Sequence, residues 1–181
     1  MHTIVNQINK GFTLLEVMAA LLVIAILATI AIPSYREYQT RAMMVDVINT
    51  LESYLTEAKK EYVSTNAIPA SVLELNSGDL TAYTKSKYID YLYYDDGTSW
   101  TNSGKAAMVQ AVISREAGGG ITGFVAGSSG ASSRVTMAFL ATGELLKQYC
   151  GSWVNDGSQV PLTYLPSGCQ DDAFNTIVTG D

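Results

Sequence analysis

The feature that most constrains this chain is a nearly unbroken apolar run close to its N-terminus, residues 12–32. As an α-helix, these 21 residues would span roughly 30 Å, which is the thickness of a bilayer core. Its only polar residues are Thr13, Glu16 and Thr29. A helix that is apolar all round predicts burial in lipid or against other apolar helices.

Glu16 is the anomaly within this run. A lone ionised carboxylate among aliphatic side chains costs several kcal/mol or more unless another group pairs with it. Its nearest neighbours on a helix face, Thr13, Val17 and Ala20, include no lysine or arginine. Either Glu16 is neutral, or its partner comes from outside the intact chain.

The residues before the run form a short polar segment that ends in Lys10 and Gly11. An ordinary secretory signal peptide carries its apolar region before the cleavage site. Here the apolar run follows the glycine, so cleavage at Gly11 would leave it attached as an anchor. Lys10 before the run, against mixed charges after it, favours a cytoplasmic N-terminus. A plain signal-anchor helix matches the length equally well but does not account for Glu16.

The segment GFTLLE, which begins at Gly11, resembles the processing signature of type IV prepilins. The resemblance implies that a prepilin peptidase cleaves between Gly11 and Phe12 and methylates the new Phe12 amine. It also implies that Glu16 pairs with the N-terminal amine of a neighbouring subunit as a filament grows. Such a pair would supply the partner that Glu16 lacks in its own chain.

Pro33 follows the apolar run and predicts a helix kink, because proline lacks an amide hydrogen and its ring crowds the preceding turn. Apolar residues then recur at steps of three and four, which favours a continuing helix over a stop. These residues are Val45, Ile48, Leu51, Leu55, Ala58 and Tyr62. We predict one helix over about residues 12–61, with an amphipathic second half. Many members of the family carry a glycine where this chain has Ala25, so loss of helix between Ala25 and Pro33 in a filament is less expected here.

Residues 63–104 are rich in turn formers and predict an irregular connection. A tyrosine cluster in it predicts packing onto its own domain rather than an exposed contact surface: Tyr88, Tyr91, Tyr93 and Tyr94. Strands are then predicted over 105–116, 121–126 and 134–141, with a shorter fourth near 145–149. Together they predict an antiparallel meander packed on the second half of the helix, an α+β fold.

Two cysteines, Cys150 and Cys169, lie near the C-terminus. A zinc site needs about four ligands, and the chain offers too few. Between a disulfide and two separate buried thiols, export favours the disulfide, which would contribute about 3 kcal/mol. The segment from Cys150 to YLPSGC, ending at Cys169, also resembles the disulfide-bounded C-terminal region of type IVa pilins. That resemblance favours a pilin over a type II secretion pseudopilin.

The charge and the histidine content narrow the function classes. The formal net charge is −6, and without the leader, ten bases against seventeen acids leave −7. This acidic body argues against DNA as a partner bound by bulk electrostatics. The sole histidine, His2, lies in the leader, so the processed chain would have none for a catalytic triad or a metal site. We predict no enzymatic activity and no cofactor.

One glycine pattern and two acidic sequences resemble ligand-binding motifs, but turns explain them better. Gly118, Gly120 and Gly123 match G-x-G-x-x-G, yet the residues that follow do not favour a helix. The sequences Asp95-Asp96-Gly97 and Asp171-Asp172 offer calcium-type oxygens, but acids are common in turns. We predict no metal site.

The resemblance divides the chain into a leader (1–11), an apolar transmembrane and filament-core half-helix (12–33) and an extracytoplasmic pilin domain (34–181). It implies a major structural subunit of a type IV pilus, stored in the inner membrane and assembled into a surface filament for adhesion, twitching motility or DNA uptake. Its partners would be further copies of itself, prepilin peptidase, the assembly platform and minor pilins. Two alternatives are a type II secretion pseudopilin or minor pilin, and a monomeric bitopic membrane protein with an extracytoplasmic binding domain.

Overall fold

The computed structural model describes residues 11–73, 75–97, 105–114, 133–142, 145–152 and 160–171. Three predictions lie outside these residues: the leader up to Lys10, the strand at 121–126, and the glycine pattern at Gly118, Gly120 and Gly123. The chain divides into two compact units, the first ending at Arg36 and the second beginning at Glu37.

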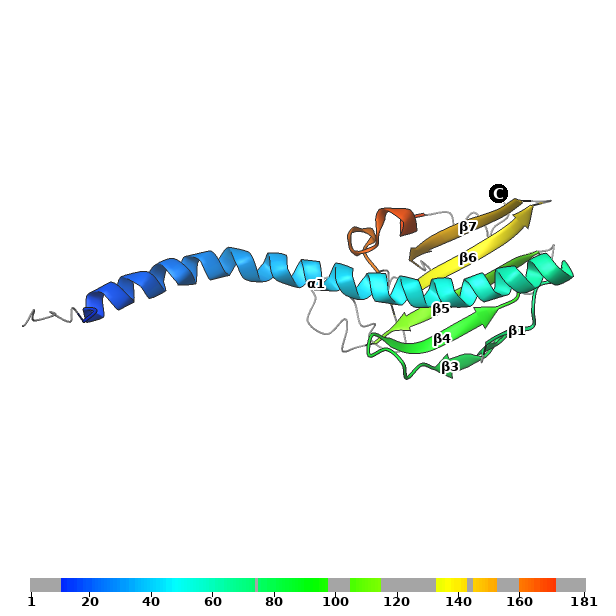
Figure 1. Ribbon diagram of the computed structural model, residues 1–181, viewed down its shortest axis with the longest axis horizontal. Coiled ribbons are helices and arrows are strands. Elements are labelled where there is room, and N and C mark those ends of the chain that lie inside the picture. Colours follow the sequence, from blue (N-terminus) through cyan, green and yellow to red (C-terminus); the bar gives the residue numbers. More distant parts are fainter. Residues whose placement is uncertain are drawn as a thin grey trace, which may run out of the picture. The chain divides into compact units, whose positions relative to one another are not determined.

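A long helix, α1 (Leu14–Thr65), contains both the apolar run and the amphipathic stretch (Figure 1). The prediction of one long helix is therefore confirmed, with a start two residues later and an end four residues later than expected. The helix continues through Pro33. Close to the proline, the hydroxyls of Thr29 and Ser34 donate to the carbonyl oxygens of Ile26 and Ile30, at 2.7 and 3.3 Å. The kink at Pro33 stays a prediction.

The second half of α1 lies along the sheet (Figure 1). It buries one stripe of side chains in the core that the two elements share. The buried positions of the helix are Thr40, Met44, Val47, Leu51, Tyr54, Leu55, Ala58 and Tyr62. Val45 was predicted in this stripe, but 45% of its surface is exposed. Met44 and Val47 take the buried places instead, because the same steps of three and four fit a stripe that starts one residue earlier.

The main sheet has five strands in the order β3-β4-β5-β6-β7, and each neighbouring pair is antiparallel. The strands are β3 (Leu80–Ala82), β4 (Ile89–Asp95), β5 (Ala106–Ile113), β6 (Arg134–Thr142) and β7 (Leu145–Ser152). A two-stranded hairpin, β1 (Ser71–Val72) and β2 (Leu75–Asn76), precedes them, and two short 3-10 helices, η1 (Leu162–Tyr164) and η2 (Ser167–Cys169), follow. The predicted α+β fold with an antiparallel meander is confirmed.

Strand β4 lies within the segment that was predicted to be irregular. Its inward side chains are Ile89, Leu92 and Tyr94, which are spaced by three and then two residues. The pairing with β5 shifts register between Ile89 and Tyr91, and this irregularity breaks the strict alternation by which a half-buried strand is recognised. The expectation of an irregular connection over 63–104 was therefore wrong for β1 to β4.

The tyrosines of β4 differ in their surroundings. Tyr94 is fully buried, and its hydroxyl donates to the Pro69 carbonyl oxygen at 2.7 Å. Tyr93 donates to Asp95 Oδ2 at 2.9 Å, while Tyr91 remains 43% exposed. Packing onto the domain therefore holds for Tyr94, and Tyr91 presents its ring at the surface.

Candidate assembly site

The predicted cleavage point lies just before α1. Gly11 and Phe12 precede the first helical residue, Leu14, and both are exposed, Phe12 to 82%. A Cβ atom built on Gly11 would meet no atom within 4 Å. Packing against the described residues therefore does not require glycine at this position.

Thr13 caps the N-terminus of α1. The backbone N–H of Glu16 lies 3.3 Å from Thr13 Oγ1, and it also donates to the Thr13 carbonyl oxygen at 3.1 Å. Threonine followed three residues later by glutamate is the pattern of a capping box, of which this structure makes the threonine half. The sequence analysis overlooked Thr13, although the Thr-x-x-Glu spacing was sufficient to find it.

Glu16 therefore lies in the first turn of α1, where the helix dipole favours a negative charge. The described residues contain ion pairs between Arg41 and Glu37 and between Lys60 and Glu57, and Glu16 takes part in neither. The helix terminus offers Glu16 partial compensation within its own chain.

The first unit exposes an almost continuous apolar surface. Between residues 12 and 32, the exposed large apolar side chains are Phe12, Leu14, Leu15, Val17, Met18, Leu21, Leu22, Val23, Ile24, Ile26, Leu27, Ile30 and Ile32. Burial of each such side chain is worth about 1.5–3 kcal/mol, so these thirteen residues are unfavourable in water. By length and composition α1 can cross a membrane, a criterion that a signal sequence also meets.

At the other end of the chain, the predicted disulfide between Cys150 and Cys169 is confirmed. Both cysteines are buried, and the backbone N–H of Asp171 donates to the Cys150 carbonyl oxygen at 3.0 Å. A Cβ atom on Gly151 would overlap the Asp171 carbonyl oxygen, so only glycine permits this close approach. The C-terminal segment is thus fixed to strand β7 by one covalent bond and by close backbone contact.

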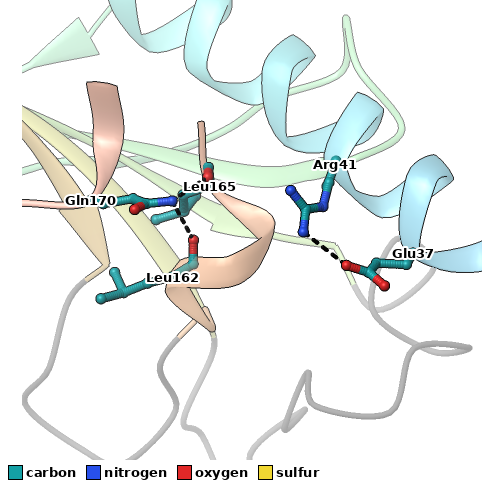
Figure 2. Close-up of polar contacts among 5 residues, drawn as sticks. All are labelled: Glu37, Arg41, Leu162, Leu165 and Gln170. Carbon is teal, nitrogen blue, oxygen red and sulfur yellow. Dashed lines mark hydrogen bonds and ion pairs between the residues drawn. The ribbon is translucent and has the colours of Figure 1, made fainter. Parts of the chain in front are cut away.

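The Gln170 side chain holds the two short helices of this segment together. Its amide nitrogen donates to the carbonyl oxygens of Leu162 and Leu165, at 3.0 and 2.9 Å. Figure 2 shows the amide between these two carbonyl groups, and it also shows the ion pair of Arg41 and Glu37 on α1. These bonds lie within the disulfide-bounded region that sequence reasoning had identified only by its cysteines.

Of the acids that resembled a calcium loop, Asp95 has a structural role. Asp95 is 5% exposed and accepts hydrogen bonds from the Tyr93 hydroxyl and the Gly97 N–H. Gly97 has a positive φ of 73°, as the turn requires. Among the described residues, no group of three or more potential metal ligands occurs, and Asp172 lies outside them.

The N-terminal region matches a known family model, and the chain as a whole is similar to several known proteins. Residues 7–32 match the family model described as the prokaryotic N-terminal methylation motif. The chain is also 24% identical to the type IV major pilin protein PilE1 of Neisseria gonorrhoeae, over 92% of this chain and 97% of that protein. It is 27% identical to the fimbrial protein EcpC of Eikenella corrodens, over 94% and 97% respectively.

The similarity thus extends well beyond the methylation motif and covers more than nine tenths of the chain. The chain belongs to the type IV pilin family. A fimbrial protein of Pseudomonas aeruginosa is 30% identical over 45% of the chain. Pilins are structural and not enzymatic, and membership implies filament polymerisation and processing by prepilin peptidase.

Proposed function

We propose that this pilin is a major subunit that polymerises through the first half of α1 after cleavage between Gly11 and Phe12. The observation that carries the proposal is an exposed apolar half-helix with a single carboxylate, Glu16, in its first turn. Before assembly this half-helix lies in the inner membrane. In the filament, contacts with other subunits replace the lipid.

Glu16 of one subunit and the Phe12 amine of a neighbouring subunit form an ion pair that aligns the two subunits. Cleavage creates an amine on Phe12, two residues before α1 begins, and a neighbouring Glu16 supplies its counter-charge. Pairing satisfies both charges inside an apolar bundle, where an unpaired charge would cost several kcal/mol. A subunit in the wrong register would leave both unpaired, so the same interaction selects the register.

The processed chain then consists of a membrane and filament-core segment, residues 12–33, and an extracytoplasmic domain, residues 34–181. The leader, residues 1–11, is removed. Assembly yields a surface filament that serves adhesion and twitching motility, with the assembly platform and minor pilins as partners. DNA uptake has less support, because the mature chain carries a formal charge of −7, from ten bases and seventeen acids.

The test is the intact mass and the N-terminal sequence of protein sheared from the cell surface. We expect a chain that begins at Phe12 and is heavier by one methyl group. A chain that begins at Met1 and occurs only in membranes would instead identify a monomeric bitopic membrane protein. A processed chain that never reaches the surface would identify a type II secretion pseudopilin.

A further inference from the structure

A shallow hollow lies at the end of the sheet where β3 ends and β4 begins. Its volume is about 520 Å³, and it is open to solvent. The side chains that matter here are Tyr83, Thr84, Ser86, Lys87, Asp90 and Tyr91. The hollow lies wholly within the second unit and has no residue in common with the N-terminal assembly site or the disulfide-bounded segment.

Hydrogen bonds that link the end of β3, the start of β4 and the end of β5 hold the backbone around the hollow in place. The Tyr83 N–H donates to the Asp90 carbonyl oxygen at 2.9 Å, which closes the β3–β4 connection. The Ser114 N–H, just past β5, donates to the Tyr88 carbonyl oxygen at 2.9 Å. Because neighbouring strands support both sides, the hollow is preformed rather than created by a ligand.

Side chains of the connection are fixed as well. The Ser86 hydroxyl donates to Asp46 Oδ2 on α1 at 3.1 Å, and it accepts from the Tyr88 N–H at 3.2 Å. The Tyr83 ring packs edge-on against Tyr54 of α1, with 6.5 Å between ring centroids. These contacts leave little conformational entropy to lose when the hollow is occupied.

The lining combines two kinds of surface. Tyr83 and Tyr91 supply aromatic side chains, and Tyr91 is 43% exposed. Hydroxyl groups, one cation (Lys87) and one anion (Asp90) supply donors and acceptors, and the two charges cancel. An apolar ligand would offer the Lys87 and Asp90 side chains no hydrogen-bonding partner, and a strongly charged ligand would find no net opposite charge.

A pyranose sugar has both surfaces that this lining requires. One face of its ring presents C–H groups that stack on an aromatic ring, and its edge presents hydroxyl groups that donate and accept hydrogen bonds. We propose that the hollow is a binding site for a short neutral oligosaccharide, stacked on Tyr91 and hydrogen-bonded by Asp90 and Lys87. The shallow shape suits a sugar chain that passes across the surface.

A shallow site of this kind binds weakly as a single copy, because it buries little of its ligand. The inference rests on the proposed function in one respect, since a filament repeats the hollow in every subunit. Repetition multiplies weak binding, with gains of about 10²–10⁴ in overall affinity when several sites engage one surface.

The experiment is saturation-transfer NMR on sheared filaments and, separately, on the full chain in detergent micelles. The probes are lactose, maltose, cellobiose and chitobiose, each at about 10 mM, which exceeds a dissociation constant of about 1 mM. We expect transfer to at least one sugar from the wild type. Tyr91→Ala should reduce it by about tenfold or more, and Asp90→Asn severalfold. Tyr149→Ala removes a half-buried tyrosine of β7 outside the hollow and should leave transfer unchanged.

Wild-type filaments that show no transfer to any of the four sugars would overturn the inference and leave the proposed function intact. Equal transfer from Tyr91→Ala and the wild type would also overturn it. If Tyr91→Ala prevents filament formation and the wild-type chain in micelles binds no sugar, the hollow accommodates a neighbouring subunit instead. Sugar binding by a chain that never forms filaments would support the inference and contradict the proposed function.

Discussion

The two halves of α1 are both helical, but their side chains have different surroundings. In the first half, Leu22 is 63% exposed, and its neighbours are similarly uncovered. In the second half, Leu51 and Leu55 are completely buried against the sheet. Secondary structure alone therefore does not show which half of the helix packs against other residues of its own chain.

The comparison indicates what each half is for. The second half contributes its stripe to the core of its own domain, so its apolar residues stabilise the monomer. The first half has an apolar surface all round and no core of its own to enter. Under the proposed assembly, lipid or other subunits cover this surface, and its apolar residues stabilise the filament rather than the monomer.

The largest expected effect comes from the single carboxylate of the first half. Glu16→Ala should leave peptidase cleavage possible but lower the yield of surface filaments by about tenfold or more, because loss of a buried ion pair exceeds 1.4 kcal/mol. Glu37→Ala is the matched control, since its exposed pair with Arg41 contributes little. Sheared filaments would be quantified by gel. Normal yields of filaments with methylated Phe12 in the Glu16 variant would contradict the proposed pairing.

Substitution of one leucine in each half of α1 distinguishes residues that stabilise the domain from residues that act only in assembly. Leu51→Ala should lower the free energy of unfolding by about 2–5 kcal/mol, because it leaves a cavity in the core. Leu22→Ala should change it by no more than about 0.5 kcal/mol, because the side chain is exposed in the monomer. Urea denaturation of the full chain in micelles measures both. If Leu22→Ala proved as destabilising as Leu51→Ala, the first half would have packing partners within its own chain.

The disulfide tests whether the second unit depends on its C-terminal segment. Cys150→Ser should lower the free energy of unfolding by about 3 kcal/mol under oxidising conditions, because it opens the loop closed by Cys169. The reduced wild type should unfold at the same denaturant concentration as the variant, while the helical signal from the first half stays unchanged. An unaltered midpoint in the variant would mean that the disulfide adds nothing to the hydrogen bonds of Gln170.

The smallest effect is a pH dependence that the second unit alone should show. Burial raises the pKa of Tyr93 to about 12, and it also raises the pKa of Tyr94. Between about pH 10 and 12 the unfolded chain loses tyrosine protons that the folded chain keeps, so stability should fall as the pH rises. Tyr94→Phe should flatten this slope, whereas Tyr38→Phe, at an exposed position of α1, should not. A slope that is the same in both variants would place its origin outside Tyr94.

The sequence predicted most of the fold where local patterns were strong. Steps of three and four predicted the second half of α1, and the alternation of Val135, Met137 and Phe139 predicted β6. Strand β4 was missed because a register shift between Ile89 and Tyr91 disrupts its alternation. The place of Val45 in the buried stripe was wrong because two adjacent phases of the pattern fit the sequence equally well.

The sequence by itself was enough to identify the N-terminal motif of this pilin. A glycine, an apolar run and one carboxylate are local features, and their spacing does not depend on any distant residue. Only the tertiary structure decided which of the remaining features meet: the Gln170 amide with two carbonyl groups, and Tyr83 with Tyr91 around one hollow. These contacts join residues of different strands and loops, and no local periodicity encodes the register that brings them together.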